Sequence, residues 1–228
     1  MTAYVQNTIV ELSPGNVATP AQTAAFGSAN VHGNAIIVFV MTAQGTTTGN
    51  PVTGVTDSAG NTYHLVVSES SGGGATNIIA GSIYVAFGVA AHTSNQISVA
   101  FTTTNVTAIS VYAVEYSGIN TFDAGAGANT AAAGTSATSA TGNFTTNHVG
   151  VIVAANYVDS PTTAPGTNYT SRRITPVDSA IIEDWIGAPA GTNNAKATLT
   201  SATTWGMVAA NFWNSVVEPT DAVFYGMT

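Results

Sequence analysis

The sequence predicts an all-β protein, an antiparallel β-sandwich with two loosely duplicated halves and minimal helix. Segments of strand length, either apolar throughout or alternating with period two, recur along the whole chain. Gly, Asn and Pro turn formers separate these segments at near-regular spacing, which is typical of sandwiches. No window longer than one turn combines a sustained 3.6-residue period with helix caps.

The composition narrows the class of protein. Only 6% of the 228 residues are charged, against about 25% in typical globular domains. Low charge is common in membrane proteins, but no apolar run here approaches the roughly 20 residues of a spanning helix, so we expect no membrane partner. Thr, Ser, Asn and Gly supply the polarity instead, as in many extracellular and virion-surface β proteins.

The charge balance and the amino terminus exclude further classes. Three basic against eleven acidic residues give a formal net charge of −8. Because phosphate binding requires clustered Lys and Arg, we expect no nucleic-acid partner. The absence of Cys excludes disulfides, thiolate metal sites and cysteine nucleophiles. Residues 1–12 show no basic region, apolar core or cleavage site, so the sequence as written predicts no Sec export.

Residues 55–67 (VTDSAGNTYHLVV) are the clearest local signal. Asp57, Gly60 and Asn61 are turn formers, because Asp and Asn bond their own backbone and Gly accepts a positive φ. The residues after the turn alternate with period two, as in a half-buried strand. The segment therefore predicts a β-hairpin.

Other strands are predicted by their apolar pattern. Residues 35–41 (AIIVFVM) are apolar throughout, which predicts a central strand with both faces covered. Residues 4–12 predict a first strand and residues 108–116 a further long one. Residues 82–87 and 96–101 predict two paired strands joined by a loop.

The second half of the chain resembles the first. The apolar run at 149–157 follows His148 as residues 35–41 follow His32, and Gly88 and Gly187 lie 99 residues apart at matching points. Duplication is the favoured interpretation, and a likeness by composition between similar hairpins is the alternative. The Ala/Gly/Thr/Ser tract at 124–140 predicts a bridging loop with weak strand character.

The domain organisation predicted is a β-sandwich domain at residues 1–214 and a C-terminal tail at 215–228. The tail ends in apolar residues that a complete sandwich does not need, and exposed apolar patches usually mark contacts. We therefore expect the tail to be an interaction segment whose subunit-contact residues are Val223, Phe224, Tyr225 and Met227.

Several segments also carry a resemblance to a known family. They are VTDSAGNTY (55–63), YAVEYSGI (112–119), GTNYTSR (166–172) and the stretch from EDW to AANF (183–212). Over residues 4–213 the chain is similar to a widespread, mostly uncharacterised bacterial and phage family. The resemblance implies a jelly-roll-like β-sandwich and supplies no catalytic residues. Members of the family occur as secreted domains and as phage structural proteins, and this chain departs from the secreted members in lacking a signal peptide.

Three acidic residues are candidates for chemistry. Glu183 and Asp184 are adjacent on a predicted strand, so they face opposite sides and cannot act as the carboxylate pair of a glycoside hydrolase. Glu115 lies in an otherwise apolar strand. We expect its carboxylate to be satisfied by backbone N–H groups or Tyr hydroxyls at a sheet edge, in preference to a catalytic role.

Metal and nucleophile signals are weak. No HxH or HExxH spacing connects the four histidines, which we expect to be structural: His32, His64, His92 and His148. The turn explains Asp57 and Asn61 better than a Ca²⁺ site does. A Gly-x-Ser-x-Gly elbow is also absent. We therefore expect no catalytic residue, no metal and no cofactor, and the protein is not predicted to be an enzyme.

The tryptophans leave two interpretations. Trp185, Trp205 and Trp213 lie within apolar runs, which favours core packing. An exposed Trp platform is the alternative, since aromatic rings hold sugars in lectin-like sandwiches.

The function predicted is that of a virion structural protein, a phage capsid decoration or fibre-like component that acts through assembly. Its partners would be other virion proteins or copies of itself, and its location the virion exterior. The alternative is a secreted carbohydrate-binding or adhesive module, extracellular after loss of a signal peptide, with a glycan as partner.

Overall fold

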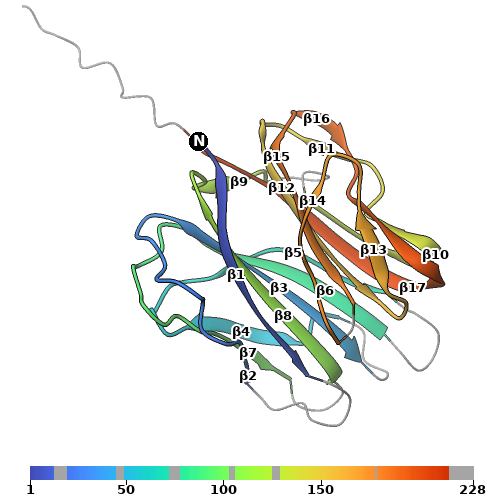
Figure 1. Ribbon diagram of the computed structural model, residues 1–228, viewed down its shortest axis with the longest axis horizontal. Helices are drawn as coiled ribbons and strands as arrows, with labels where there is room; N and C mark the ends of the chain where they lie inside the picture. The colour runs from blue at the N-terminus through green and yellow to red at the C-terminus, as the bar shows by residue number, and fades with distance from the viewer. Residues whose placement is uncertain are drawn as a thin grey trace, which may run out of the picture.

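The computed structural model describes residues 1–12, 20–44, 49–71, 78–102, 106–124, 129–177 and 179–215. Within these residues the fold is all-β, as predicted, and no helix is present. Two large antiparallel sheets lie face to face, and a smaller set of strands covers the outer face of each (Figure 1). No helix of the described residues is long and apolar enough to cross a membrane.

The first half of the chain forms one large and one small sheet. The large sheet has the order β1-β8-β3-β6-β5, in which the strands are β1 (Ala3–Leu12), β8 (Val106–Ser117), β3 (Ala35–Gln44), β6 (Ile78–Ala86) and β5 (His64–Ser71). The small sheet has the order β2-β7-β4, with β2 (Ala21–Gln22), β7 (Ile97–Phe101) and β4 (Val52–Asp57). The first strand and the strand at 108–116 are confirmed.

The second half repeats this arrangement. Its large sheet has the order β10-β17-β12-β15-β14, with β10 (Asn129–Ala140), β17 (Lys196–Trp213), β12 (Gly150–Val158), β15 (Ile181–Ala188) and β14 (Thr170–Ile174). Outside this path, β11 (Phe144–Thr146) pairs with β16 (Gly191–Asn193), while β13 (Thr162–Pro165) and β9 (Thr121–Phe122) pair with β17.

The strand orders confirm the two duplicated halves. Each strand of the second large sheet carries a number nine higher than its counterpart, from β10 for β1 to β14 for β5. The register agrees with the spacing of 99 residues, since Ile36 pairs with Ala86 and Ile152 with Trp185. Gly88 and Gly187 then occupy the same position, and both have a positive φ, 61° and 78°. The fifth strand of each half, β5 or β14, lies in the large sheet of that half. The jelly-roll form of the sandwich stays a prediction.

The two halves are arranged about an approximate two-fold axis. β3 lies against its own counterpart β12, while β6 lies against β17 and β5 against β10. The strand order of one sheet therefore runs in the opposite direction to that of the sheet facing it. At the opposite margin, Asn7 of β1 accepts a hydrogen bond from Arg173 of β14 at 3.3 Å. This is the geometry of an isologous dimer, realised here within one chain.

The central strand β3 explains the layering. Its side chains alternate, with Ile37, Phe39 and Met41 in the core between the two large sheets. Ile36, Val38 and Val40 face the other way, into the core beneath the small sheet of the first half; all six are buried. Both faces of the strand are therefore covered, which confirms the prediction from the apolar run. A third core lies on the outer face of the second large sheet.

Two predicted strand pairings are wrong. β4 pairs with β7 in the small sheet and β5 pairs with β6 in the large sheet, so the turn at 57–63 crosses between sheets and does not close a hairpin. For the same reason the strands predicted at 82–87 and 96–101 are not paired, because β6 and β7 belong to different sheets. Local turn chemistry specifies a reversal of the chain but not the sheet that each arm joins.

The tract at 124–140 is also corrected. Residues 129–140 form β10, which pairs with β17 along its length. Small side chains allow this, because a Cβ added at Gly134 would lie only 2.8 Å from the Trp205 ring. The ring therefore packs directly onto the strand, and its Nε1 donates to Ser136 Oγ at 3.0 Å. Tertiary packing overrides the low strand propensity of Ala and Gly.

Candidate functional site

Glu115 is a buried carboxylate surrounded by amide donors. It lies in β8, has no exposed surface, and accepts hydrogen bonds from four N–H groups. Their donors are Gln6 Nε2 (2.7 Å), Asn30 Nδ2 (2.7 Å), Val31 N (2.9 Å) and Asn34 Nδ2 (2.7 Å). The predicted structural role is thus supported, but the donors are amides and not Tyr hydroxyls. β8 lies between β1 and β3 and is not a sheet edge.

Asp57 closes the turn between β4 and β5. Its carboxylate accepts hydrogen bonds from the Asn61 backbone (2.9 Å) and side chain (2.7 Å), from Tyr63 Oη (2.9 Å) and from Asn95 Nδ2 (2.9 Å). Burial raises the pKa of Asp57, but the hydrogen bonds from Asn95, Asn61 and Tyr63 outweigh it and hold this pKa below its ordinary value. The contacts support a turn role for Asp57 and Asn61, as expected from the sequence.

Glu183 and Asp184 face opposite sides of β15, as predicted. Asp184 points toward the core between the large sheets, where its Oδ2 accepts hydrogen bonds from Tyr116 Oη at 2.6 Å and from Arg172 Nε at 2.8 Å. Glu183 points outward and accepts a hydrogen bond from the Gly166 N–H at 2.8 Å. The two carboxylates cannot act on one substrate from this arrangement.

Burial gives Glu183 a property that the sequence did not reveal. Loss of solvent raises its pKa from an ordinary value of 4.5 to about 8; the Gly166 hydrogen bond opposes the rise and the nearby Asp184 charge adds to it. The carboxyl group is therefore largely protonated at neutral pH. No sequence pattern indicates this, because the pKa depends on the layer that covers β15.

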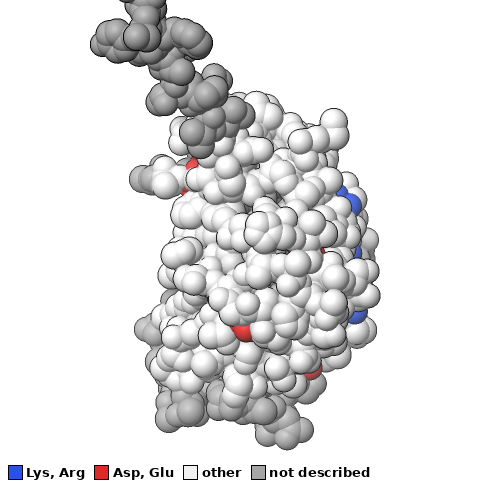
Figure 2. Space-filling view, turned by 90° about the vertical axis from the view of Figure 1, so that its left-hand side faces the viewer, with Lys and Arg blue, Asp and Glu red and all other residues white. Residues whose placement is uncertain are grey.

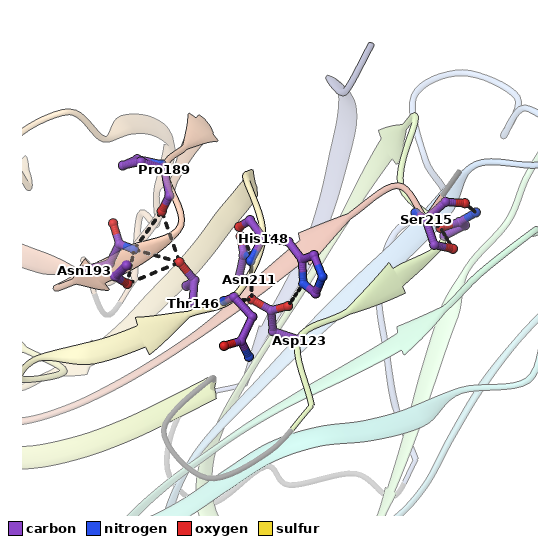
Figure 3. A network of polar contacts seen from close by, with 10 residues as sticks. Asp123, Thr146, His148, Pro189, Asn193, Asn211 and Ser215 are labelled. Atoms are coloured by element: carbon purple, nitrogen blue, oxygen red, sulfur yellow. Dashed lines mark hydrogen bonds and ion pairs between the residues drawn. The ribbon is translucent and has the colours of Figure 1, made fainter. Parts of the chain in front are cut away.

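A second polar group joins β9, the start of β12 and the end of β17 (Figure 3). Asp123 contacts His148 Nδ1 at 2.5 Å and accepts hydrogen bonds from Asn147 N at 2.7 Å and Asn211 Nδ2 at 3.0 Å. The imidazole stacks on Trp213, with ring centroids 3.6 Å apart. Burial raises the pKa of Asp123, but the bonds from His148 and Asn211 outweigh it and lower this pKa. Asp123 was not predicted as a site residue.

The histidines do not converge. Within the described part of the chain, no group of three or more His, Asp and Glu side chains is placed to hold a metal ion. His32 and His148 each lie four residues before the paired positions Ile36 and Ile152, so they are equivalent points of the duplicated halves. The structure brings His148 to Asp123, and it leaves His32 on an exposed turn.

The tryptophans divide into two groups. Trp205 is buried in the outer core, as the core-packing interpretation predicted, and Trp213 is only partly exposed beneath His148. Trp185 differs, because its indole is partly exposed at the edge of a hollow of about 280 Å³. Its ring is held edge-on by Tyr169, with centroids 5.9 Å apart.

The hollow beside Trp185 combines one aromatic ring with polar groups, of which only Lys196 is charged. Its lining includes Trp185, Thr167, Asn168, Thr192, Asn194 and Lys196. Asn168 precedes β14 with a φ of 72°, Asn194 follows β16, and Lys196 begins β17. Such a surface can stack a flat apolar face and form hydrogen bonds around it.

A larger hollow of about 340 Å³ lies where the two halves meet, at the end of β1 and the start of β8. Its lining includes Glu11, Ile109, Tyr157, Asp159 and Val177. Burial raises the pKa of Asp159. This hollow is apolar with acidic margins and contains none of the residues singled out from the sequence.

Comparisons with protein-family models, with curated proteins and with solved structures found no match for this chain. The family resemblance inferred from the four segments therefore stays a prediction. The predicted contact residues Val223, Phe224, Tyr225 and Met227 lie outside the described residues.

Proposed function

We propose that this protein is a structural component of a virion exterior, a phage capsid decoration protein or fibre-like component that acts through assembly and not through catalysis. The observation that carries the proposal is the placement of charge. Glu115, Asp123 and Asp184 are all buried and face other parts of the same chain. They serve as internal ties between strands that are distant in sequence.

The exterior is correspondingly poor in charge. On the face drawn in Figure 2 nearly all the surface belongs to uncharged residues, with a few acidic atoms and with basic residues along one margin. A surface of Thr, Ser, Asn and Gly lets many copies lie side by side without strong repulsion. The formal net charge of −8 suits a position outside a capsid, away from the genome.

The architecture suits a mechanical role. Two large sheets share one core, and each has a second core on its outer face. Polar ties such as Asp184 with Tyr116 cross between the halves within this packing. Local unfolding of such a unit requires a large free energy, because most of its backbone lies in paired strands that are covered by other strands.

The rival function is a secreted carbohydrate-binding or adhesive module. One observation favours it, the partly exposed indole of Trp185 at the edge of a hollow. The two functions differ in what the protein associates with. The proposed function requires a stable association with copies of itself or with a particle, and the rival function requires neither.

Size-exclusion chromatography with light scattering, followed by negative-stain electron microscopy, separates the two. The proposed function predicts a symmetric assembly with a mass that is a fixed multiple of 22.9 kDa. A monomer at every concentration, with no regular particles in the micrographs, would favour the secreted module.

A further inference from the structure

We propose that the hollow beside Trp185 is a binding site for one sugar residue of a glycan, held by stacking on the indole and by hydrogen bonds from the surrounding amides and hydroxyls. The site lies on the outer face of the second half, between the turn before β14 and the segment after β16. The proposed binding site does not depend on the assembly role.

The duplicated halves provide an internal comparison for Trp185. The register places Trp185 opposite Ile152, and the equivalent pair in the first half is Ala86 opposite Ile36. Ala86 is fully covered and the strand around it packs normally. The first half thus builds its outer core with a small side chain at this position, whereas the indole of Trp185 packs against the outer core of the second half and also reaches the hollow.

The neighbouring tyrosine shows the same difference between the halves. Tyr63 and Tyr169 are equivalent, because each precedes the strand that pairs with β6 or β15. The Tyr63 hydroxyl donates to Asp57 at 2.9 Å, which closes the turn of the first half. The Tyr169 hydroxyl is buried and has no hydrogen-bond partner among the described residues. The second half thus lacks the polar closure that covers the corresponding region of the first.

The lining specifies the chemistry of the ligand. An indole face attracts the C–H face of a pyranose ring, and the polar rim of such a ring needs both donors and acceptors. The Asn168 and Asn194 amides offer both, the Thr167 and Thr192 hydroxyls offer both, and the Lys196 ammonium donates. Uncharged groups dominate, so the chemistry fits a polyhydroxylated ligand better than a phosphate or a peptide.

The volume limits the size of the ligand. About 280 Å³ lies just below the range of roughly 300 to 1,000 Å³ that is typical of sites for drug-sized ligands. One sugar ring, with the rest of the glycan outside, is therefore the expected occupant. A single stacked ring gives weak binding, with a dissociation constant on the order of 1 mM, which corresponds to about −4 kcal/mol.

Saturation-transfer NMR on the full chain tests the site. The probes are the methyl glycosides of glucose, galactose, N-acetylglucosamine and glucuronic acid. We expect saturation transfer to at least one of them, strongest at the ring protons that lie on the indole. Absence of transfer to all four probes, at concentrations well above 1 mM, would overturn the proposal.

Variants locate the binding. Trp185→Ala copies the residue of the first half, so the fold should be retained, and the signal should fall at least tenfold. Asn168→Gly removes one amide at a position whose φ of 72° glycine adopts readily, so it decides the question even if the Trp185 variant is unstable. Trp213→Phe, outside the hollow, is the matched control and should keep full binding. Binding that survives both Trp185→Ala and Asn168→Gly contradicts the assignment.

Discussion

Two buried glutamates of this chain differ in the number of hydrogen bonds that their carboxyl groups accept. Glu115 accepts four hydrogen bonds, whereas Glu183 accepts one and its Oε1 has no partner among the described residues. A buried carboxylate without donors is costly when charged. The two residues therefore make opposite contributions to stability at neutral pH, and each can be tested by a single isosteric change.

Replacement Glu183→Gln should stabilise the protein at and above neutral pH. The folded-state pKa of about 8 exceeds the ordinary value of 4.5, so the folded state binds the proton more tightly than the unfolded state. The wild-type stability from this group is present below pH 4.5 and is lost as the pH rises toward 8. A tenfold difference in proton affinity between the folded and unfolded states corresponds to about 1.4 kcal/mol of stability.

Thermal or urea unfolding at pH 5 and pH 8.5 measures this effect. The variant and the wild type should be close at pH 5, and the variant should have the higher melting temperature at pH 8.5. Parallel stability profiles for the two proteins would show that Glu183 is not buried as described.

Replacement Glu115→Gln should destabilise the protein by about 3 kcal/mol, because an NH₂ group would then face N–H donors in a buried site. Urea unfolding measures the change, with Asp159→Asn as a control that should shift the midpoint far less, because no N–H donor of the described residues bonds to that carboxylate. A loss below about 0.5 kcal/mol would mean that the four amide donors find other partners.

The sequence predicts some of these residue roles and not others. Glu115 was expected to be a satisfied structural carboxylate because it lies in an apolar strand, and this holds. Asp123 and His148 are 25 residues apart and meet only because β9 and β12 flank the end of β17. Trp185 packs against the outer core and is also partly exposed, and hydrophobic patterning alone does not distinguish this position from full burial.

At the scale of the elements, strand existence was more predictable than strand pairing. The apolar run of β3 and the spacing between Gly88 and Gly187 contain enough information to identify a central strand and a duplication. The turn at 57–63 does not contain enough to distinguish a hairpin from a crossing between sheets. β10 was missed for a related reason. Its small residues have low strand propensity, and they form a strand because they pair with β17 and pack against the Trp205 ring of that strand.

The duplicated elements differ most at the interface between the halves. Arg172 lies at a register shift between Ser171 and Arg173, and its equivalent Val66 lies at the matching shift in β5. Asp184 is likewise equivalent to Val85. One margin of the interface thus holds the ion pair of Arg172 with Asp184, to which Tyr116 donates a hydrogen bond, and the equivalent positions at the other margin are apolar.

This difference predicts a strong coupling between two substitutions. Asp184→Val alone leaves Arg172 without its carboxylate and should cost about 3 kcal/mol. The double variant Asp184→Val with Arg172→Val removes the unpaired guanidinium and should recover the part of the loss that comes from Arg172, while the Tyr116 hydroxyl still lacks its acceptor. Urea unfolding of the four proteins in a double-mutant cycle measures the coupling. Additive losses would mean that the ion pair contributes nothing beyond its separate parts.

At the scale of the whole molecule, the chain is an internal dimer that presents an exterior of low charge. The inner faces of its two large sheets are buried against each other. These faces are therefore not accessible to a second copy of the chain. Association with further copies must then use other surfaces. The sequence after residue 215 is the strongest candidate, because it adds Val223, Phe224, Tyr225 and Met227 beyond the last strand.

Deletion of residues 221–228 should weaken assembly and leave the fold intact. The far-ultraviolet circular dichroism spectrum and the melting temperature should stay within error of the full chain, while the mass from light scattering falls. A matched variant with Glu218→Gln keeps the apolar residues and should assemble normally. An unchanged oligomer mass after the deletion would remove the tail from the proposed interface.

The most direct test of the proposed function is to ask whether the protein is part of a particle. Particles released from a lysed culture that encodes this chain would be purified on a density gradient, and their proteins quantified by mass spectrometry. The proposed function predicts that the chain sediments with the capsid proteins in a fixed ratio of copies. Recovery of the chain only in the soluble fraction, with none in the particle band, would contradict it.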